Sequence, residues 1–161
     1  MQTIGLGYDS HRFGSDGVLK LGGVEIPHNC GLIGHSDADV LLHAVTDAVL
    51  GAAGLDDIGE LFPDTDPQYR GADSSVFLQR ALETAAGESL RVINCDVTVL
   101  AQEPKLAGFK LQIKERLAEL LGIPTQRVAV KAKTNELMGF VGRSEGIVAI
   151  AAVMLSDEPS G

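Results

Sequence analysis

The chain has 161 residues, 45% of them hydrophobic, which fits one domain with an ordinary buried core. Its 13 basic and 22 acidic residues give a net charge of −9, so we expect neither nucleic acid nor a membrane as a partner. Cys30 and Cys95 lack metal-ligand spacing, which predicts reduced thiols and a cytoplasmic protein. We expect a single domain over residues 1–156 and a disordered tail over residues 157–161.

Hydrophobic periodicity predicts strands near both ends of the chain and helices between them. Residues 55–70 are rich in Asp, Pro and Gly and should be irregular. The predicted elements, in chain order, are a strand over residues 3–13, a hairpin over 18–26, helices over 40–49 and 74–86, a strand over 92–100, a helix over 108–121, and strands over 128–134 and 147–155. This order favours an α/β (α+β) fold, with a mixed four-stranded sheet and helices on one face.

The first helix is expected to begin at Ser36. Ser36 followed by Asp39 resembles a capping box with a short carboxylate in place of Glu, so Ser36 is the predicted N-cap. A helix N-terminus offers free N–H groups and a positive dipole end to a phosphate. His35, which comes just before it, could donate a hydrogen bond to the same anion.

The last predicted strand is apolar at both parities. Residues 147–155 contain only Ile, Val, Ala, Met and Leu, so both faces of this strand should be buried. Helices can cover only one face of a small sheet, and we therefore expect the other face to pack against other subunits. A strand enclosed within one subunit, or a buried helix end, is the alternative.

Two segments carry residues that zinc accepts as ligands. Asp9 and His11 are one residue apart on a predicted strand, so their side chains leave the same face. His43 lies on the first helix, where Asp39 and Asp47, four residues away on either side, could orient its imidazole. Three protein ligands leave one coordination position open, as in catalytic zinc sites. Asp-x-His pairs and single histidines are more often surface or boundary residues. Their spacing in the sequence does not show whether the two segments meet.

Basic residues near two strand ends are candidates for phosphate contacts. Lys105 follows one predicted strand, and Lys131 and Lys133 share one face of another that leads to Thr134. Arg143 lies in a predicted turn. A solvated strand face and an exposed turn are the commoner explanations of such charges.

Taken in order, these motifs resemble those of the 2-C-methyl-D-erythritol 2,4-cyclodiphosphate synthase family. Residues 7–13 resemble the metal-binding opening of the family, and residues 35–47 resemble its signature helix. Agreement of many separate motifs in the same order is specific. Further matching segments are residues 57–59, 61–67, 71–74, 94–97, 101–105, 131–132 and 134–146, so the resemblance spans roughly residues 4–155.

The resemblance implies two metal sites. Asp9, His11 and His43 would bind Zn²⁺, with one ion per subunit. Glu136 would ligate a second divalent cation, Mg²⁺ or Mn²⁺, between the α- and β-phosphates of the substrate.

The resemblance also implies the catalytic and substrate-binding residues. His35 and Thr134 would be catalytic, contacting the phosphates and stabilising the transition state. The implied substrate-binding residues are Ser36; Asp57, Ile58 and Gly59 at the ribose; Phe62, Pro63, Asp64, Thr65 and Asp66 at the methylerythritol; Ala101, Gln102, Glu103, Pro104, Lys105, Leu106 and Ala107 at the cytosine; and Lys133, Thr134, Asn135, Glu136, Phe140 and Arg143.

The implied enzyme is a homotrimeric phosphorus–oxygen lyase of the non-mevalonate isoprenoid pathway, with the sheets facing the trimer axis and each site between subunits. It would convert 4-diphosphocytidyl-2-C-methyl-D-erythritol 2-phosphate to 2-C-methyl-D-erythritol 2,4-cyclodiphosphate and CMP. The substrate's own phosphate is the nucleophile, and the metals supply positive charge that the acidic chain lacks. Two alternatives remain: a metal-dependent nucleotide or diphosphate hydrolase, and a non-catalytic trimeric metal-binding scaffold.

Overall fold

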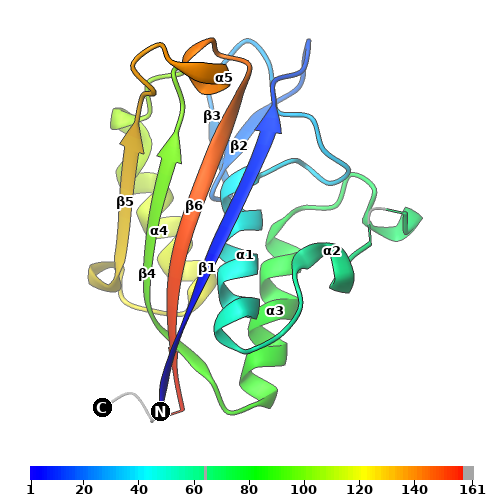
Figure 1. Ribbon diagram of the computed structural model, residues 1–161, viewed down its shortest axis with the longest axis vertical. Coiled ribbons are helices and arrows are strands. Elements are labelled where there is room, and N and C mark those ends of the chain that lie inside the picture. Colours follow the sequence, from blue (N-terminus) through cyan, green and yellow to red (C-terminus); the bar gives the residue numbers. More distant parts are fainter. Residues whose placement is uncertain (64, 158–161) are drawn as a thin grey trace.

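A computed structural model describes residues 1–63 and 65–157. Within these ranges, four strands form a mixed sheet in the order β1-β6-β4-β5 (Figure 1). β6 is antiparallel to both of its neighbours, and β5 is parallel to β4. The strands are β1 (Gln2–Arg12), β4 (Arg91–Leu100), β5 (Val128–Lys133) and β6 (Gly146–Ser156). The predicted mixed four-stranded sheet is therefore confirmed. The predicted tail falls largely outside the described residues, because only Asp157 of residues 157–161 is described.

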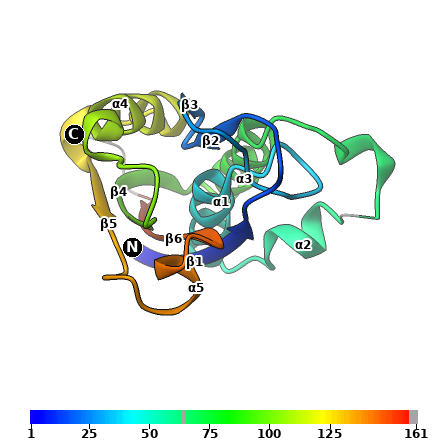
Figure 2. The same cartoon turned by 90° about the horizontal axis from the view of Figure 1, so that it is seen from above.

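The long helices cover one face of this sheet (Figure 2). They are α1 (Val40–Ala52), α3 (Ser75–Gly87) and α4 (Lys110–Leu121). The predicted hairpin is present as β2 (Leu19–Leu21) and β3 (Val24–Ile26), and it lies against α1 and α4. In the described part of the chain, no helix has the length and apolar character needed to cross a membrane.

Short helical turns follow β4, precede β5 and β6, and lie between α1 and α3 in the chain. They are α2 (Ile58–Leu61), α5 (Gly139–Gly142) and the 3-10 turns η1 (Pro67–Tyr69), η2 (Ala107–Phe109) and η3 (Thr125–Arg127). The expectation that residues 55–70 are irregular is wrong for α2 and η1. Asp57 Oδ1 accepts the N–H of Glu60 (3.1 Å) and Asp66 Oδ1 accepts the N–H of Gln68 (3.0 Å), so each turn begins at a capping carboxylate.

The start of α1 differs from the prediction. Ser36 is not the N-cap, because the helix begins at Val40 and Asp39 caps it. The fully buried Asp39 carboxylate accepts the N–H of Leu42 (3.0 Å) and also those of Gly22 (2.9 Å) and Gly23 (2.7 Å) in the hairpin turn. Three N–H donors that converge on one buried carboxylate fix the helix start there.

Helix α1 lies directly on β1, and glycine makes this approach possible. A Cβ atom on Gly5 would be 2.0 Å from the carbonyl oxygen of Ala48, and one on Gly7 would be 1.8 Å from that of Ala44. Both distances are far shorter than any non-bonded contact. Ile4, Leu6 and Tyr8 alternate with these glycines along β1, so their large side chains point to the opposite face of the sheet.

Among the described residues, the helices cover one face of β6 and bury its side chains. On the opposite face, Ile150, Ala152 and Met154 are half-buried and lie beside the exposed residues Leu6 (72% exposed) and Tyr8 (57% exposed) of β1, whereas Val148 is buried. The open face contains Ile4, Leu6 and Tyr8 of β1 and Ile150, Ala152 and Met154 of β6. That other subunits cover this open face stays a prediction.

Candidate metal centre and substrate cavities

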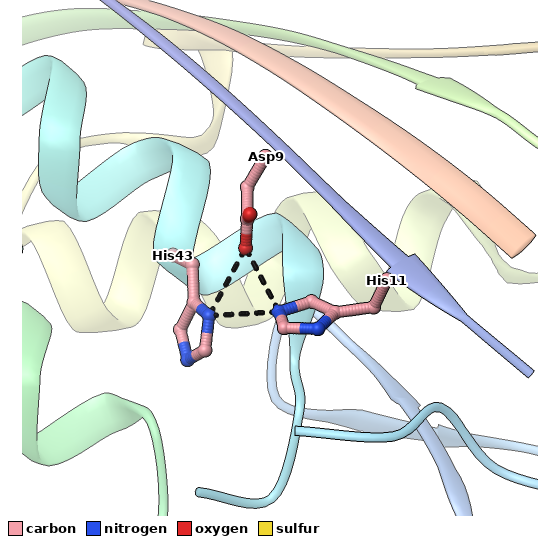
Figure 3. Close-up of side chains that lie close together, drawn as sticks. All are labelled: Asp9, His11 and His43. Carbon is pink, nitrogen blue, oxygen red and sulfur yellow. Dashed lines mark hydrogen bonds and ion pairs between the residues drawn. The ribbon is translucent and has the colours of Figure 1, made fainter. Parts of the chain in front are cut away.

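Asp9, His11 and His43 direct three potential ligand atoms towards one point (Figure 3). Asp9 and His11 leave the helix-covered face of β1, and His43 reaches them from the first turn of α1. Asp9 Oδ2 is 2.9 Å from His11 Nε2 and 3.1 Å from His43 Nδ1, and the two nitrogen atoms are 3.2 Å apart. Ligand atoms about 2.0–2.1 Å from a tetrahedral zinc ion would be about 3.3 Å from one another, so this triangle fits such an ion. Among the described residues, no other group of three His, Cys, Asp or Glu ligands is this compact.

Hydrogen bonds behind the two imidazoles direct their ligand nitrogens inward. His11 Nδ1 is 2.9 Å from the carbonyl oxygen of Ile33, which can only accept, so Nδ1 carries the proton and Nε2 carries the lone pair. His43 Nε2 is 3.0 Å from Ser36 Oγ and 2.9 Å from Ser74 Oγ. Metal-binding histidines usually have such partners, which fix the ring and raise its basicity.

The same triangle shifts the pKa values of Asp9 and His11 in opposite directions. Burial raises the pKa of Asp9, but hydrogen bonds and charge from His11 and His43 outweigh burial and hold that pKa far below its usual range. Burial lowers the pKa of His11, but the hydrogen bond and the charge of Asp9 raise it above its ordinary value. Asp9 is therefore an anionic ligand at neutral pH. The charge of Asp9 favours protonation of His11, and a bound cation would displace that proton.

The carboxylates expected to orient His43 have other partners. Asp39 joins α1 to the hairpin turn, as described above, and Asp47 Oδ1 accepts the N–H of Ile58 (2.8 Å). The prediction that Asp39 and Asp47 hold the imidazole is wrong, because two serine hydroxyl groups do so. Asp47 instead fixes the start of α2, which carries part of the expected ribose segment.

His11 and His43 contribute to the wall of a cavity of about 330 Å³. An aromatic cluster of Phe62, Tyr69 and Phe77 forms another part of the wall, with ring centroids 5.0–5.6 Å apart. The cavity brings together several residues predicted from the sequence, namely His35, Ser36, Ile58, Gly59 and Phe62. We call it the zinc-side cavity, after the ion that the family resemblance predicts for Asp9, His11 and His43.

The loop after α2 borders this region. The carbonyl oxygen of Asp66 is 3.4 Å from His35 Nε2, and the side chain of Asp66 caps η1. Pro63 and Thr65 are exposed, and Asp64, also expected at the substrate, lies outside the described residues.

A second cavity, of about 230 Å³, lies beside β5. We call it the β5-side cavity. Most residues of the predicted cytosine segment line it together with Lys133 and Thr134, whereas Glu103 is exposed and does not. Its lining residues are Ala101, Gln102, Pro104, Lys105, Leu106, Ala107, Lys110, Ala132, Lys133 and Thr134.

The segment after β5 is held by its own hydrogen bonds. Thr134 Oγ1 donates to Glu136 Oε1 (3.1 Å), and Asn135 Nδ2 donates to the carbonyl oxygen of Met138 (2.8 Å). Arg143 Nε donates to Glu145 Oε1 (2.6 Å) on the surface. Phe140 lines a third cavity, of about 510 Å³, together with His11 and other residues near the end of β1.

The zinc-side and β5-side cavities are at opposite edges of the sheet. β1 and β5 are the two edge strands, and their C-terminal ends lie at the same end of the sheet (Figure 1). Within one chain, the structure therefore does not bring His35 and the metal-ligand triangle together with Thr134, Glu136 and the cytosine segment.

Comparison with known proteins identifies the family. The model of the YgbB family matches residues 2–156. The 2-C-methyl-D-erythritol 2,4-cyclodiphosphate synthase of Nitrosococcus oceani is 52% identical over 155 residues, which cover 96% of this chain and 98% of the relative. The chain belongs to the YgbB family of cyclodiphosphate synthases.

Solved structures agree with this membership. A 2-C-methyl-D-erythritol 2,4-cyclodiphosphate synthase with bound CDP matches with a TM-score of 0.88 and 37% identity, covering 95% of this chain and 99% of that chain. The bifunctional IspDF of Campylobacter jejuni matches with a TM-score of 0.92 and 44% identity, covering 96% of this chain and 42% of that chain.

The family motifs did not reveal every residue at the two cavities. Tyr69 and Phe77 line the zinc-side cavity, Lys110 lines the β5-side cavity, and Ser74 contacts His43. Phe77 has the spacing of an ordinary helix-core residue, and no signal in the sequence separates it from one. Ser74 lies in the matching segment 71–74, but its position at a helix start gave it no predicted role at the site.

Proposed function

We infer that the chain is a phosphorus–oxygen lyase that converts 4-diphosphocytidyl-2-C-methyl-D-erythritol 2-phosphate to 2-C-methyl-D-erythritol 2,4-cyclodiphosphate and CMP. The observation that carries this inference is the Asp9–His11–His43 triangle at a cavity wall, in a chain that is 52% identical to a curated synthase along 98% of its length. The reaction belongs to the non-mevalonate pathway of isoprenoid precursors.

The reaction needs no nucleophile from the protein. An oxygen of the 2-phosphate forms a bond to the β-phosphorus, the bond from the β-phosphorus to the bridging oxygen breaks, and the electron pair leaves with CMP. The protein must hold two anionic groups in line and offset their repulsion.

Asp9, His11 and His43 would hold Zn²⁺ and leave a fourth position for a substrate oxygen. A bound zinc ion supplies positive charge that polarises a phosphoryl oxygen. His35 and Ser36, in the wall of the same cavity, would donate hydrogen bonds to the phosphates.

Glu136 would ligate the second cation, Mg²⁺ or Mn²⁺. Magnesium is usually bound by one or two carboxylates together with substrate phosphates, so a single exposed glutamate is a suitable protein ligand. The hydrogen bond from Thr134 Oγ1 to Glu136 orients this carboxylate and leaves Thr134 beside the same phosphates. In the β5-side cavity, residues 101–107 would hold the cytosine.

A homotrimer with sites between subunits would join the two cavities. Each chain carries the metal-ligand residues near one edge of its sheet and the cytosine-segment residues near the other edge. In the trimer, the zinc-side cavity of one subunit would meet the β5-side cavity of its neighbour. The open apolar face of β1 and β6 supports packing of the sheets around a common axis.

Leu6→Asp should dissociate this assembly without unfolding the chain. Leu6 is 72% exposed in the isolated subunit, so the charge has no cost there, but it would be buried without a partner in the trimer. Light scattering should give the trimer mass for the parent and a lower mass for the variant. Leu111→Asp is the matched control, because Leu111 is similarly exposed (64%) but lies on α4. A monomeric, active parent would exclude the trimer.

Product analysis tests the function directly. The chain, incubated with the cytidyl substrate, Zn²⁺ and Mg²⁺, should release CMP and the cyclic diphosphate in equal amounts, as measured by mass spectrometry. A hydrolase would release CMP together with the linear 2,4-bisphosphate, which is heavier than the cyclic diphosphate by one water. A scaffold protein would bind metal and release no CMP. Either result would reject the proposal.

A further inference from the structure

Ser74 precedes the first residue of α3 but does not cap the helix. Its side chain makes no capping hydrogen bond, and the N–H of Ser75 is instead bound by Asp73 Oδ1 (2.9 Å). Ser74 is 0% exposed. A buried hydroxyl group is almost always hydrogen-bonded, so its partners indicate what it does.

The Ser74 hydroxyl group lies between a carboxylate and an imidazole. Its Oγ atom donates a short hydrogen bond to Asp37 Oδ1 and is 2.9 Å from His43 Nε2. The backbone N–H of Ser74 also donates to Asp37 Oδ1 (3.2 Å). Lys20 Nζ, 3.4 Å from Asp37 Oδ2, holds the carboxylate from the other side.

The protons in this chain of hydrogen bonds can be assigned. A carboxylate only accepts, so the single hydroxyl proton of Ser74 is committed to Asp37. Ser74 Oγ can then only accept from His43, which requires the proton on Nε2. Ser36 Oγ, 3.0 Å from the same nitrogen, is a second acceptor for that proton. His43 Nδ1 therefore keeps its lone pair, and this is the atom that faces Asp9 and His11.

We propose that Ser74, fixed by Asp37, is a positioning residue that holds His43 in the tautomer and the orientation required for metal binding. The inference rests on the metal site of the proposed function. It assigns to Ser74 and Asp37 a role in metal affinity, without contact to substrate or metal.

Zinc affinity of the full chain, measured by competition with a chromophoric chelator, tests the role. Ser74→Ala should weaken zinc binding by about 10- to 100-fold, the usual effect of losing a partner of a metal-binding histidine. Ser74→Thr keeps the hydroxyl group and should restore most of the affinity. Ser75→Ala is the matched control, since it removes a neighbouring hydroxyl group that does not contact His43, and its affinity should equal that of the parent.

The absorption spectrum of the cobalt-substituted protein gives a second readout, because it reports ligand geometry. Ser74→Ala should alter the spectrum, and Ser75→Ala should not. If Ser74→Ala does not fold, as judged by circular dichroism, Asp37→Asn replaces it. That variant leaves Ser74 in place but frees its proton, and it too should weaken zinc binding. If the folded variant binds zinc as tightly as the parent, the positioning role of Ser74 is wrong, but the proposed metal site is unaffected. A parent that binds no zinc overturns the metal site as well.

Discussion

Replacing Gly7 with alanine should remove a large part of the stability of the fold. The new Cβ atom would lie 1.8 Å from the carbonyl oxygen of Ala44 and 2.9 Å from the backbone nitrogen of Ala48. Both atoms belong to the backbone of α1, so no side-chain rotation can relieve the clash, and the helix must move away from β1. Overpacking usually costs about 1–3 kcal/mol and occasionally more. Because a whole buried helix is displaced here, we expect about 4 kcal/mol or more, out of a typical total of about 5–15 kcal/mol.

Urea denaturation measures this effect, with Gly51→Ala as the matched control. Gly51 lies on the same helix, but beyond the helix backbone the nearest atom to a Cβ there would be the Cα atom of Gly5, at 3.9 Å. Alanine at Gly51 should therefore stabilise the helix by about 0.5–1 kcal/mol. Equal urea midpoints for Gly7→Ala and the parent would show that β1 and α1 are not in direct backbone contact.

His43→Ala should remove the zinc and nearly all synthase activity while leaving the chain folded. His43 is half-buried at the cavity, whereas the core side of α1 is formed by its aliphatic residues. Loss of a metal that contributes about 4 kcal/mol to transition-state stabilisation would lower the rate of CMP release by about 10³-fold. The zinc content, measured by elemental analysis, should fall from about one ion per chain to none.

His28→Ala is the matched control for this experiment. His28 packs against Phe13 at a tilted angle, with ring centroids 5.2 Å apart, and is not part of the triangle. That variant should retain zinc and activity. Unchanged zinc content in His43→Ala would remove His43 from the ligand set and would leave Asp9 and His11 without their expected partner.

Features that depend on local periodicity could be predicted from the sequence. Alternation in β1 gives Asp9 and His11 a common face, and apolar spacing in α1 gives the helix that carries His43. That the two segments meet depends on glycine at positions 5 and 7, because any side chain there would keep the helix away from the strand. The motif resemblance, rather than periodicity, predicted most residues of both cavities but not Tyr69, Phe77 or Lys110.

Features that depend on distant partners could not be predicted. Ser36 and Asp39 are both acceptable N-caps, and the hairpin turn decides between them by offering two N–H donors to Asp39. Ser74 also has the sequence signature of an N-cap, yet its hydroxyl group binds Asp37 and His43 instead. In both cases a contact between residues far apart in the sequence overrides the local preference.

The central position of β6 has a consequence for the order of folding. β6 separates β1 from β4, so β1 has no neighbour in the sheet until β6 has been made. The pairing of Gln2 with Ser156 closes a loop of nearly the full chain length. Contacts of such high sequence separation make folding slow. During synthesis, β1 and the α1 backbone against which it packs must therefore wait without a complete sheet until residues 146–156 emerge.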